Sequence, residues 1–292
     1  MTAPTEPATR SRDDPVAADR VSARTEPAAR SGARGTRRRV AGSPVDAVSL
    51  EAAVAFVAAA LARRTACRIV VTNANKAWLA ARDARLREIL EGADLVVAEW
   101  ATSWAARTLG VAGVEHVGGI TLMVRLLAEA ERSGWSCYFL GAAPGVAETL
   151  VARLRRERPA LRIAGWHHGY LDEASRATVV AELVAKRPDL LFVAMGSPLQ
   201  EYFLAGLPAS AAGAGLGVGG SFDVLAGLKR DAPAWARGRG LEWLYRLSQD
   251  PRRLWRRYLV TNTWFVARVV RERLARRRAA PLAGAEGGGA AR

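Results

Sequence analysis

Six short apolar runs alternate with helix-like segments across most of this 292-residue chain, and this alternation restricts the folds that it can adopt. The runs are mostly β-branched or aromatic, which is typical of strands. Strands that alternate with helices predict a largely parallel sheet with helices on both faces. We therefore expect an α/β, Rossmann-like core. The expected strands cover residues 68–72, 94–98, 136–141, 161–164, 189–195 and 213–219, and the expected helices cover about 75–91, 119–133, 145–157, 174–186 and 199–206, behind a first helix capped by Ser49.

Composition divides the chain into segments of different character. Residues 1–43 are rich in Arg, Pro and Ala without apolar periodicity, so they are expected to be disordered. The α/β core is expected over residues 44–240. A basic, aromatic and helical appendage is expected over residues 241–278, and a disordered Gly/Ala-rich tail over residues 279–292.

The formal net charge of +15 lies mainly toward the two ends of the chain. Residues 1–45 carry nine Arg against five acidic residues, and residues 246–278 carry eleven Arg against two, whereas residues 46–245 hold 22 basic and 20 acidic residues. A nucleic-acid-binding core would carry its positive charge on the folded domain. The nearly neutral body therefore predicts no nucleic-acid partner for the core.

The appendage interleaves tryptophan, tyrosine and aliphatic residues with its arginines. This composition is typical of a helix that lies in the interface of an anionic membrane; a helix packed on the core or on a partner, and an RNA-binding face, are the alternatives. No uncharged apolar run reaches the roughly 18 residues of a transmembrane helix, and no signal peptide is expected. Cys67 and Cys137 lie in strand-like runs and are expected to be reduced. We therefore expect a cytoplasmic protein, peripheral on the inner face of the plasma membrane.

Polar residues that directly follow the apolar runs are the candidates for a site, because ligands of such sheets bind beyond the carboxyl ends of the strands. Gln200 could bind an amide, a uracil or a sugar hydroxyl, or it could be an ordinary surface residue. The loop that begins at Gly141 could hold a phosphate with its backbone amides, or it could be a plain turn. The candidates are Thr72, Asn73, Asn75, Glu99, and residues 141–145, 196–201 and 219–223.

Metal ligands are scarce in this sequence. The three histidines include the adjacent His167 and His168, with no cysteine nearby, and no D-x-D pair of carboxylates occurs. We therefore expect neither a bound metal nor another cofactor. A nucleotide-sugar enzyme built in this way would stabilise its diphosphate with arginines, backbone amides and helix ends.

Several separate segments, spread over about residues 44–260, together resemble the WecG/TagA/CpsF glycosyltransferases (glycosyltransferase family 26), which elongate lipid-linked glycans at the bacterial cytoplasmic membrane. The segments at 219–227, 232–233 and 241–252 are the most specific. The matching segments, in the order of the family, are Thr-Asn at 72–75, Gly-Ile-Thr-Leu-Met at 119–123, Phe-Leu-Gly at 139–141 with Pro-Gly-Val at 144–146, Gly-Tyr-Leu at 169–171, Gly-Ser-Pro-Leu-Gln-Glu at 196–201, Gly-Gly-Ser-Phe-Asp at 219–223 with Ala-Gly at 226–227, Ala-Pro at 232–233, and Leu-Glu-Trp-Leu-Tyr-Arg-Leu at 241–247 with Pro-Arg at 251–252.

This resemblance implies an inverting, metal-independent transfer of a sugar from a UDP-sugar to a polyprenyl-diphosphate-linked saccharide, in the biosynthesis of cell-surface polysaccharide or teichoic-acid-type polymers. It is compatible with a homo-oligomer. It also assigns roles to residues. Glu99 stands where the family has its proposed base, Asn73 matches the active-site Asn with Thr72 beside it, and the positions expected to bind substrate are His116, Gly141, Tyr170, Gln200, Asp223, Arg246, Arg252 and Arg256.

Two positions depart from the family pattern. The family usually has Pro-Asp-Gly where this chain has Ala98-Glu99-Trp100, so the carboxylate is one methylene longer. The family usually has Arg at the position where this chain has His116. The replacement of Arg by His removes a permanent cation. These departures leave open a membrane-associated nucleotide-sugar-binding protein whose catalysis has lapsed. The alternation of strands and helices alone would also permit a nicotinamide- or nucleotide-dependent enzyme of another class, although the sequence lacks the glycine fingerprints of such enzymes.

Overall fold

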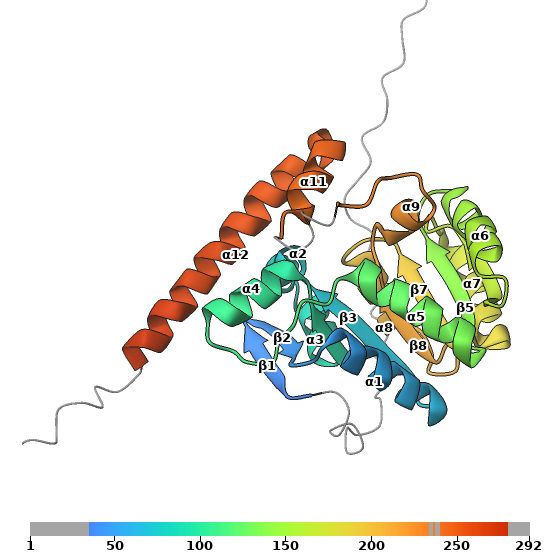
Figure 1. The fold of residues 1–292 in the computed structure, drawn as a ribbon, viewed down its shortest axis with the longest axis horizontal. Coiled ribbons are helices and arrows are strands. Elements are labelled where there is room, and N and C mark those ends of the chain that lie inside the picture. Colours follow the sequence, from blue (N-terminus) through green and yellow to red (C-terminus); the bar gives the residue numbers. More distant parts are fainter. Residues whose placement is uncertain (1–34, 234–235, 237–239, 280–292) are drawn as a thin grey trace, which may run out of the picture.

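A six-stranded parallel sheet forms the centre of the protein, for which this computed structural model describes residues 35–233, 236 and 240–279. The strand order is β4-β3-β8-β7-β5-β6, and every neighbouring pair is parallel. Figure 1 shows the sheet with helices packed around it. The strands are β3 (Cys67–Thr72), β4 (Leu95–Ala98), β5 (Ser136–Gly141), β6 (Arg162–His167), β7 (Leu190–Ala194) and β8 (Ala214–Gly217).

Helices cover both faces of the sheet, because alternate strand residues point to opposite sides. Val71 joins the core under α1, α5, α6 and α9, whereas Val70 joins the core under α2 and α3. Helices α7 and α8 cover β5 and β7 on that second side. The expected α/β, Rossmann-like fold is confirmed. The covering helices are α1 (Leu50–Ala62), α2 (Ala74–Ala80), α3 (Ala84–Glu91), α5 (Gly119–Ser133), α6 (Val146–Glu157), α7 (Glu173–Lys186), α8 (Leu199–Ala205) and α9 (Ser221–Leu225).

The helix expected over residues 75–91 is two helices, so that prediction was wrong in its continuity. The first helix ends at Ala80. Asp83 caps the second, since its carboxylate accepts a 3.0 Å hydrogen bond from the Leu86 N–H. An Asp at this position stabilises a new helix start more than it stabilises a helix interior. The expected strand at 161–164 is likewise longer in the structure, where β6 runs to His167.

A helix that the sequence did not predict, α4 (Trp100–Thr108), follows β4. Glu99 occupies its N-cap position without making a side-chain capping hydrogen bond. The segment also contains Trp, Thr and Ser, which are weak helix formers. Packing of Ala105 and Ala106 into a buried cluster stabilises α4 instead.

The part of the expected N-terminal tail that the structure describes is folded. Strands β1 (Arg37–Val40) and β2 (Ser43–Asp46) form an antiparallel hairpin, which corrects the expected boundary at residue 43. The Arg37 guanidinium donates to the Asp46 carboxylate and to the Ala93 carbonyl, while Asp46 accepts from the Val96 N–H on β4. Ala93 and Val96 lie 50 or more residues from the hairpin residues that they contact, so local composition could not reveal these contacts. Residues 1–34, and the expected tail from residue 280, lie outside the described residues.

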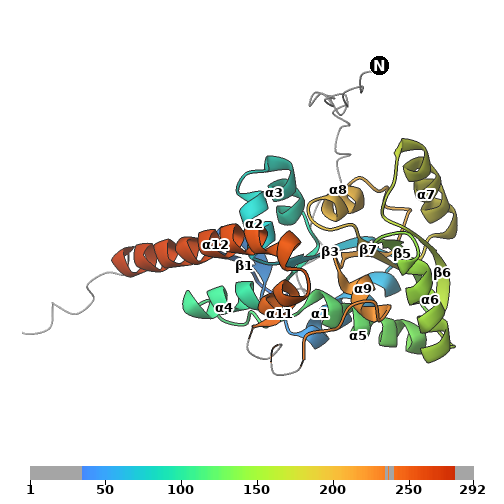
Figure 2. The ribbon, with the colours of Figure 1, turned by 90° about the horizontal axis from the view of Figure 1, so that it is seen from above.

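The appendage consists of two helices, α11 (Glu242–Gln249) and α12 (Pro251–Ala279), which begins at a proline. Figures 1 and 2 show α12 lying along the end of the molecule near α2 and α4 and projecting beyond it. The Arg82 guanidinium lies between two rings, 4.4 Å from the centroid of Trp78 and 5.5 Å from that of Trp264, and thereby links the core to α12. Of the helices described, none is long and apolar enough to span a membrane.

Candidate active site

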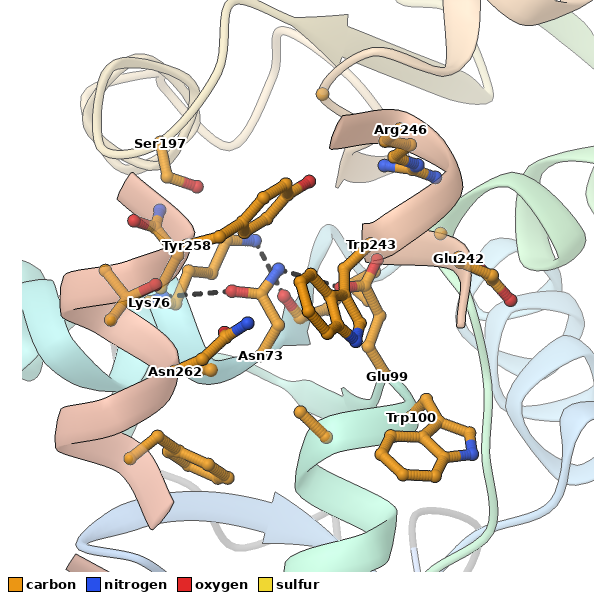
Figure 3. A pocket seen from close by; sticks show the side chains of 18 of the residues that line it. Asn73, Lys76, Glu99, Trp100, Ser197, Glu242, Trp243, Arg246, Tyr258 and Asn262 are labelled. Atoms are coloured by element: carbon orange, nitrogen blue, oxygen red, sulfur yellow. Dashed lines mark hydrogen bonds between the residues drawn. The ribbon is translucent and has the colours of Figure 1, made fainter. Parts of the chain in front are cut away.

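A cavity of about 490 Å³ opens at the carboxyl ends of β3, β4 and β8. Loops that follow these strands and β7 supply one side, and α11 and α12 supply the other. Figure 3 shows side chains from both sides pointing into the same space. The appendage is therefore part of this site, and of the site residues expected from the sequence Asn73, Glu99, His116, Gln200 and Arg246 line the cavity.

Asn73 and Glu99 form a hydrogen-bonded pair in the wall of the cavity. The Asn73 Nδ2 donates to Glu99 Oε2 at 2.8 Å, and Asn73 Oδ1 accepts from the Lys76 N–H at 2.9 Å, which caps α2. The Glu99 N–H donates to the Thr72 carbonyl at 2.9 Å, so the ends of β3 and β4 are held together. A carboxylate with one oriented neighbour, facing a cavity, is suited to accept a proton from a bound hydroxyl.

His116 lies in the same wall, beside the end of β4, where Val117 N–H donates to the Ala98 carbonyl at 2.7 Å. His116 keeps contact with solvent, yet the surrounding protein partly desolvates its ring, and this desolvation is the main cause that lowers the pKa of His116 from 6.5. The negative charge of Glu99 acts in the opposite direction, and Arg107 lowers the pKa further. The imidazole is therefore mostly neutral at pH 7 and, unlike an arginine, carries no permanent charge.

A buried ion pair contributes to the cavity wall through Lys76. Lys76 Nζ is 2.8 Å from Glu201 Oε1 and donates to the Val71 carbonyl at 2.7 Å, and both side chains are almost fully buried. Glu201 Oε1 also accepts from Gln200 Nε2 at 2.8 Å, while Glu201 Oε2 is buried without a partner among the described residues. This pair joins the start of α2 to the start of α8.

Gln200 reaches the cavity, yet both ends of its amide have partners inside the protein. Its Nε2 donates to Glu201, and its Oε1 accepts from the Gly219 N–H at 3.0 Å. The side chain lies across Gly217, where an added Cβ would be 2.5 Å from Nε2. Gln200 therefore holds the glycine-rich loop after β8 against the cavity, with one N–H and one lone pair left for a ligand.

Two arginines of the appendage line the cavity, Arg246 on α11 and Arg257 on α12. Both are exposed in this structure. A guanidinium can bind two phosphate oxygens at once, and its charge is permanent. The two side chains could therefore stabilise the negative charge of a diphosphate. His116 carries no permanent positive charge with which to do so.

The family model described as the glycosyl transferase WecG/TagA/CpsF family matches residues 38–279. The chain belongs to this family. It is 31% identical over 210 residues, 70% of this chain and 79% of the other, to an N-acetylglucosaminyldiphosphoundecaprenol N-acetyl-beta-D-mannosaminyltransferase of Bacillus spizizenii strain W23. It is 34% identical over 148 residues, 49% of this chain and 56% of the other, to a protein of the same name from Bacillus subtilis strain 168. The expected family and its glycosyltransferase activity are confirmed.

Five expected site residues of this glycosyltransferase lie outside the lining of the cavity. Thr72 is buried, and its carbonyl accepts from Glu99 N–H and Thr102 Oγ1. Arg252 and Arg256 are exposed on α12 away from the cavity lining. Gly141 ends β5 and Tyr170 follows β6, and these two strands stand at the far side of the sheet from β3.

Asp223 is a sixth such residue. It lies on α9, where its carboxylate is 3.5 Å from Lys229 Nζ. The assignment of Asp223, Gly141 and Tyr170 to nucleotide binding stays a prediction. The strands that carry or precede them end at the same edge of the sheet as the cavity, so this assignment is compatible with the fold.

Sequence reasoning missed three features of the glycosyltransferase site. Lys76 could have been found, since it is one of only three lysines in a chain that otherwise uses arginine. Arg257 differs from Arg256 only by one position on a helix, so composition could not select it. The rings of Trp100, Trp243 and Tyr258 also line the cavity.

Proposed function

We propose that this glycosyltransferase moves a sugar from a UDP-sugar to a polyprenyl-diphosphate-linked saccharide, with inversion at the anomeric carbon and without a metal ion, in the biosynthesis of a cell-surface polysaccharide or teichoic-acid-type polymer. The observation that carries the proposal is the Glu99–Asn73 pair facing a cavity that also holds Arg246 and Arg257. The names of the two Bacillus relatives support the class of acceptor.

Glu99 would act as the general base. It would take the proton of the acceptor hydroxyl as that oxygen attacks the anomeric carbon, while the bond to the UDP oxygen breaks on the opposite side. A single displacement of this kind inverts the configuration. Asn73 would hold the carboxylate in place through its Nδ2 donor.

The leaving diphosphate needs charge stabilisation more than it needs a proton. Arg246 and Arg257 line the cavity and would supply that charge. The glycine-rich loop held by Gln200 would place backbone amides close to the nucleotide. These groups support a reaction in which the protein itself, and not a metal ion, supplies the positive charge that stabilises the leaving diphosphate.

Membrane docking is the second part of the proposal. Several large apolar side chains of α12 that are about half exposed or more lie outside the cavity lining, and exposed arginines lie between them along the helix. These apolar residues include Trp255, Leu259, Val270 and Leu274. Each basic residue near an anionic leaflet contributes about 1 kcal/mol, and apolar side chains add burial in the interface. The enzyme would thus be peripheral on the inner face of the plasma membrane, where a lipid-linked acceptor is found.

The test compares the wild type with Glu99→Gln, using UDP-N-acetylhexosamines and N-acetylglucosamine linked through a diphosphate to a short alkyl chain. Turnover should fall about 10²- to 10⁴-fold, with the UDP dissociation constant nearly unchanged. Glu115→Gln, at an exposed position outside the cavity lining, is the matched control. The anomeric configuration of the product by NMR tests inversion, and activity in EDTA tests metal independence.

Near-normal turnover of Glu99→Gln would contradict the assignment of the base. The alternative, a nucleotide-sugar-binding protein without catalysis, is favoured by the presence in the cavity of His116, which carries no permanent charge. It predicts that the wild type binds UDP and anionic vesicles but transfers no sugar from any donor of a UDP-sugar panel.

A further inference from the structure

Two indole rings from different helices border the space around Glu99. Trp100 directly follows Glu99 at the start of α4, and Trp243 comes from α11. Both line the cavity, and Figure 3 shows them with Glu99 in the same view. We propose that these indoles form the subsite for the terminal pyranose ring of the acceptor; this rests on the proposed function.

The position of Trp100 is fixed before any ligand binds. Its ring is stacked with that of Trp104, with centroids 6.4 Å apart and an angle of 10° between the planes. Its other neighbour is Gly240, where an added Cβ would be 1.9 Å from the ring. Gly240 adopts a φ of +70°, in the left-handed region, so the chain passes over the indole at a residue that no side chain can replace without displacement.

Trp243 is held differently and remains more open. Its ring meets that of Tyr258 edge to face, with centroids 5.8 Å apart and an angle of 69°. It is 38% exposed, although it lines the cavity. An exposed indole that is already oriented loses little conformational entropy when a flat ligand binds to it.

The chemistry of the cavity selects a sugar ring as the occupant. A general base must lie about 2.6–3.2 Å from the hydroxyl whose proton it takes, so the acceptor pyranose must lie beside Glu99 and hence beside the indoles. A pyranose has faces of C–H groups, whose positive hydrogens suit the negative face of the partly exposed Trp243 ring. The faces of the Trp100 ring are covered by its stacked partner and by the chain that passes over it, so the edge of this ring would contact the sugar. The hydroxyl edge of the sugar can meet the polar side chains of Asn75 and Asn262, which also line the cavity.

The geometry of an inverting transfer distinguishes the acceptor from the donor. The attacking hydroxyl and the leaving diphosphate lie on opposite sides of the anomeric carbon. Glu99 is on the side of the hydroxyl, so the diphosphate and the uracil extend away from Glu99. The indoles beside Glu99 therefore contact the acceptor sugar and not the nucleotide.

The experiment measures kinetics of Trp100→Leu, Trp243→Leu and Trp243→Phe on the short-chain diphosphate-linked N-acetylglucosamine. The KM for this acceptor should rise about 10- to 100-fold in Trp243→Leu, the loss expected for a stacked aromatic contact, and by a smaller factor in Trp100→Leu, where only the edge of the ring is lost. The kcat and the UDP dissociation constant should stay within about twofold. Trp243→Phe should retain most of the affinity, because it keeps an aromatic face.

Trp166→Leu is the control, since Trp166 is a partly buried indole on the edge strand β6, outside the cavity lining. A rise in the UDP dissociation constant with an unchanged acceptor KM would overturn the proposal, as would no change in either. Direct binding of the acceptor analogue, measured by calorimetry without donor, tests the acceptor subsite separately from the proposed transfer of a sugar. Tryptophan-dependent binding without any transfer would leave the subsite standing and contradict the proposed function.

Discussion

The side chain of Asn73 donates a 2.8 Å hydrogen bond to the carboxylate of Glu99 and, through its other end, caps the helix that carries Lys76. One residue thus links the orientation of a carboxylate to the start of α2. The two functions use different atoms of the amide. They can therefore be separated by substitution.

Asn73→Asp should keep the helix cap and lose the donor. Asp and Asn are equally good N-caps, so any fall in the unfolding temperature should come from repulsion between the two carboxylates and should lessen as the pair takes up a proton at lower pH. The new carboxylate faces Glu99, and two like charges raise the pKa of one member of the pair. The acidic limb of the pH–rate profile should therefore move to higher pH, with slower transfer at neutral pH. Asn73→Ala should lower both stability and transfer, and an unshifted pH profile for Asn73→Asp would contradict the contact.

Lys76→Met should destabilise the protein strongly. It removes the only ion-pair partner shown for Glu201 among the described residues and leaves that carboxylate buried. Breaking a buried pair from one side costs about 3–5 kcal/mol. The double variant Lys76→Met/Glu201→Met should recover a large part of the loss, because no uncompensated charge remains. Urea unfolding of both single variants and the double variant measures the coupling, and additive losses would refute it.

Leu259→Glu and Val270→Glu should weaken membrane binding together. Both side chains are exposed on α12, by 61% and 49%, and burial of such a side chain contributes about 1.5–3 kcal/mol. Binding to vesicles with anionic lipid should fall at least about tenfold for the pair, while transfer to the short-chain soluble acceptor is retained. Val184→Glu, a comparably exposed position on α7, is the control. Unchanged sedimentation with vesicles would exclude these apolar side chains as the docking surface.

His116 should make the protein less stable as the pH falls below 6.5. Its pKa is lowered in the folded state by partial desolvation of its ring, so below 6.5 the unfolded chain takes up a proton that the folded chain does not. The free energy of unfolding therefore decreases between 6.5 and the folded pKa, and is unaffected above 6.5. His116→Gln should remove this part of the decline in urea unfolding at pH 5.5 relative to pH 7.5. An NMR titration of His116 with a midpoint above 6.5 would contradict the effect of desolvation.

The fold class and part of the site followed from the sequence because their signals are local. Apolar runs of strand length alternate with helical segments, and Asn73 and Glu99 each follow such a run directly. Parallel strands end at one edge of a sheet, so both residues had to lie at that edge. The motifs that resemble the family added the expectation of a base at Glu99.

The order of the strands was decided only by the tertiary structure. β8 lies next to β3, which brings the loop of Gly219 into the cavity, whereas β5 and β6 stand further away and leave Gly141 and Tyr170 outside its lining. Lys76 and Glu201 meet across 125 positions of sequence, and α12 turns Arg257, not Arg256, toward the cavity. Local propensity fixes where strands and helices begin, but which of them become neighbours depends on how their apolar faces are buried together.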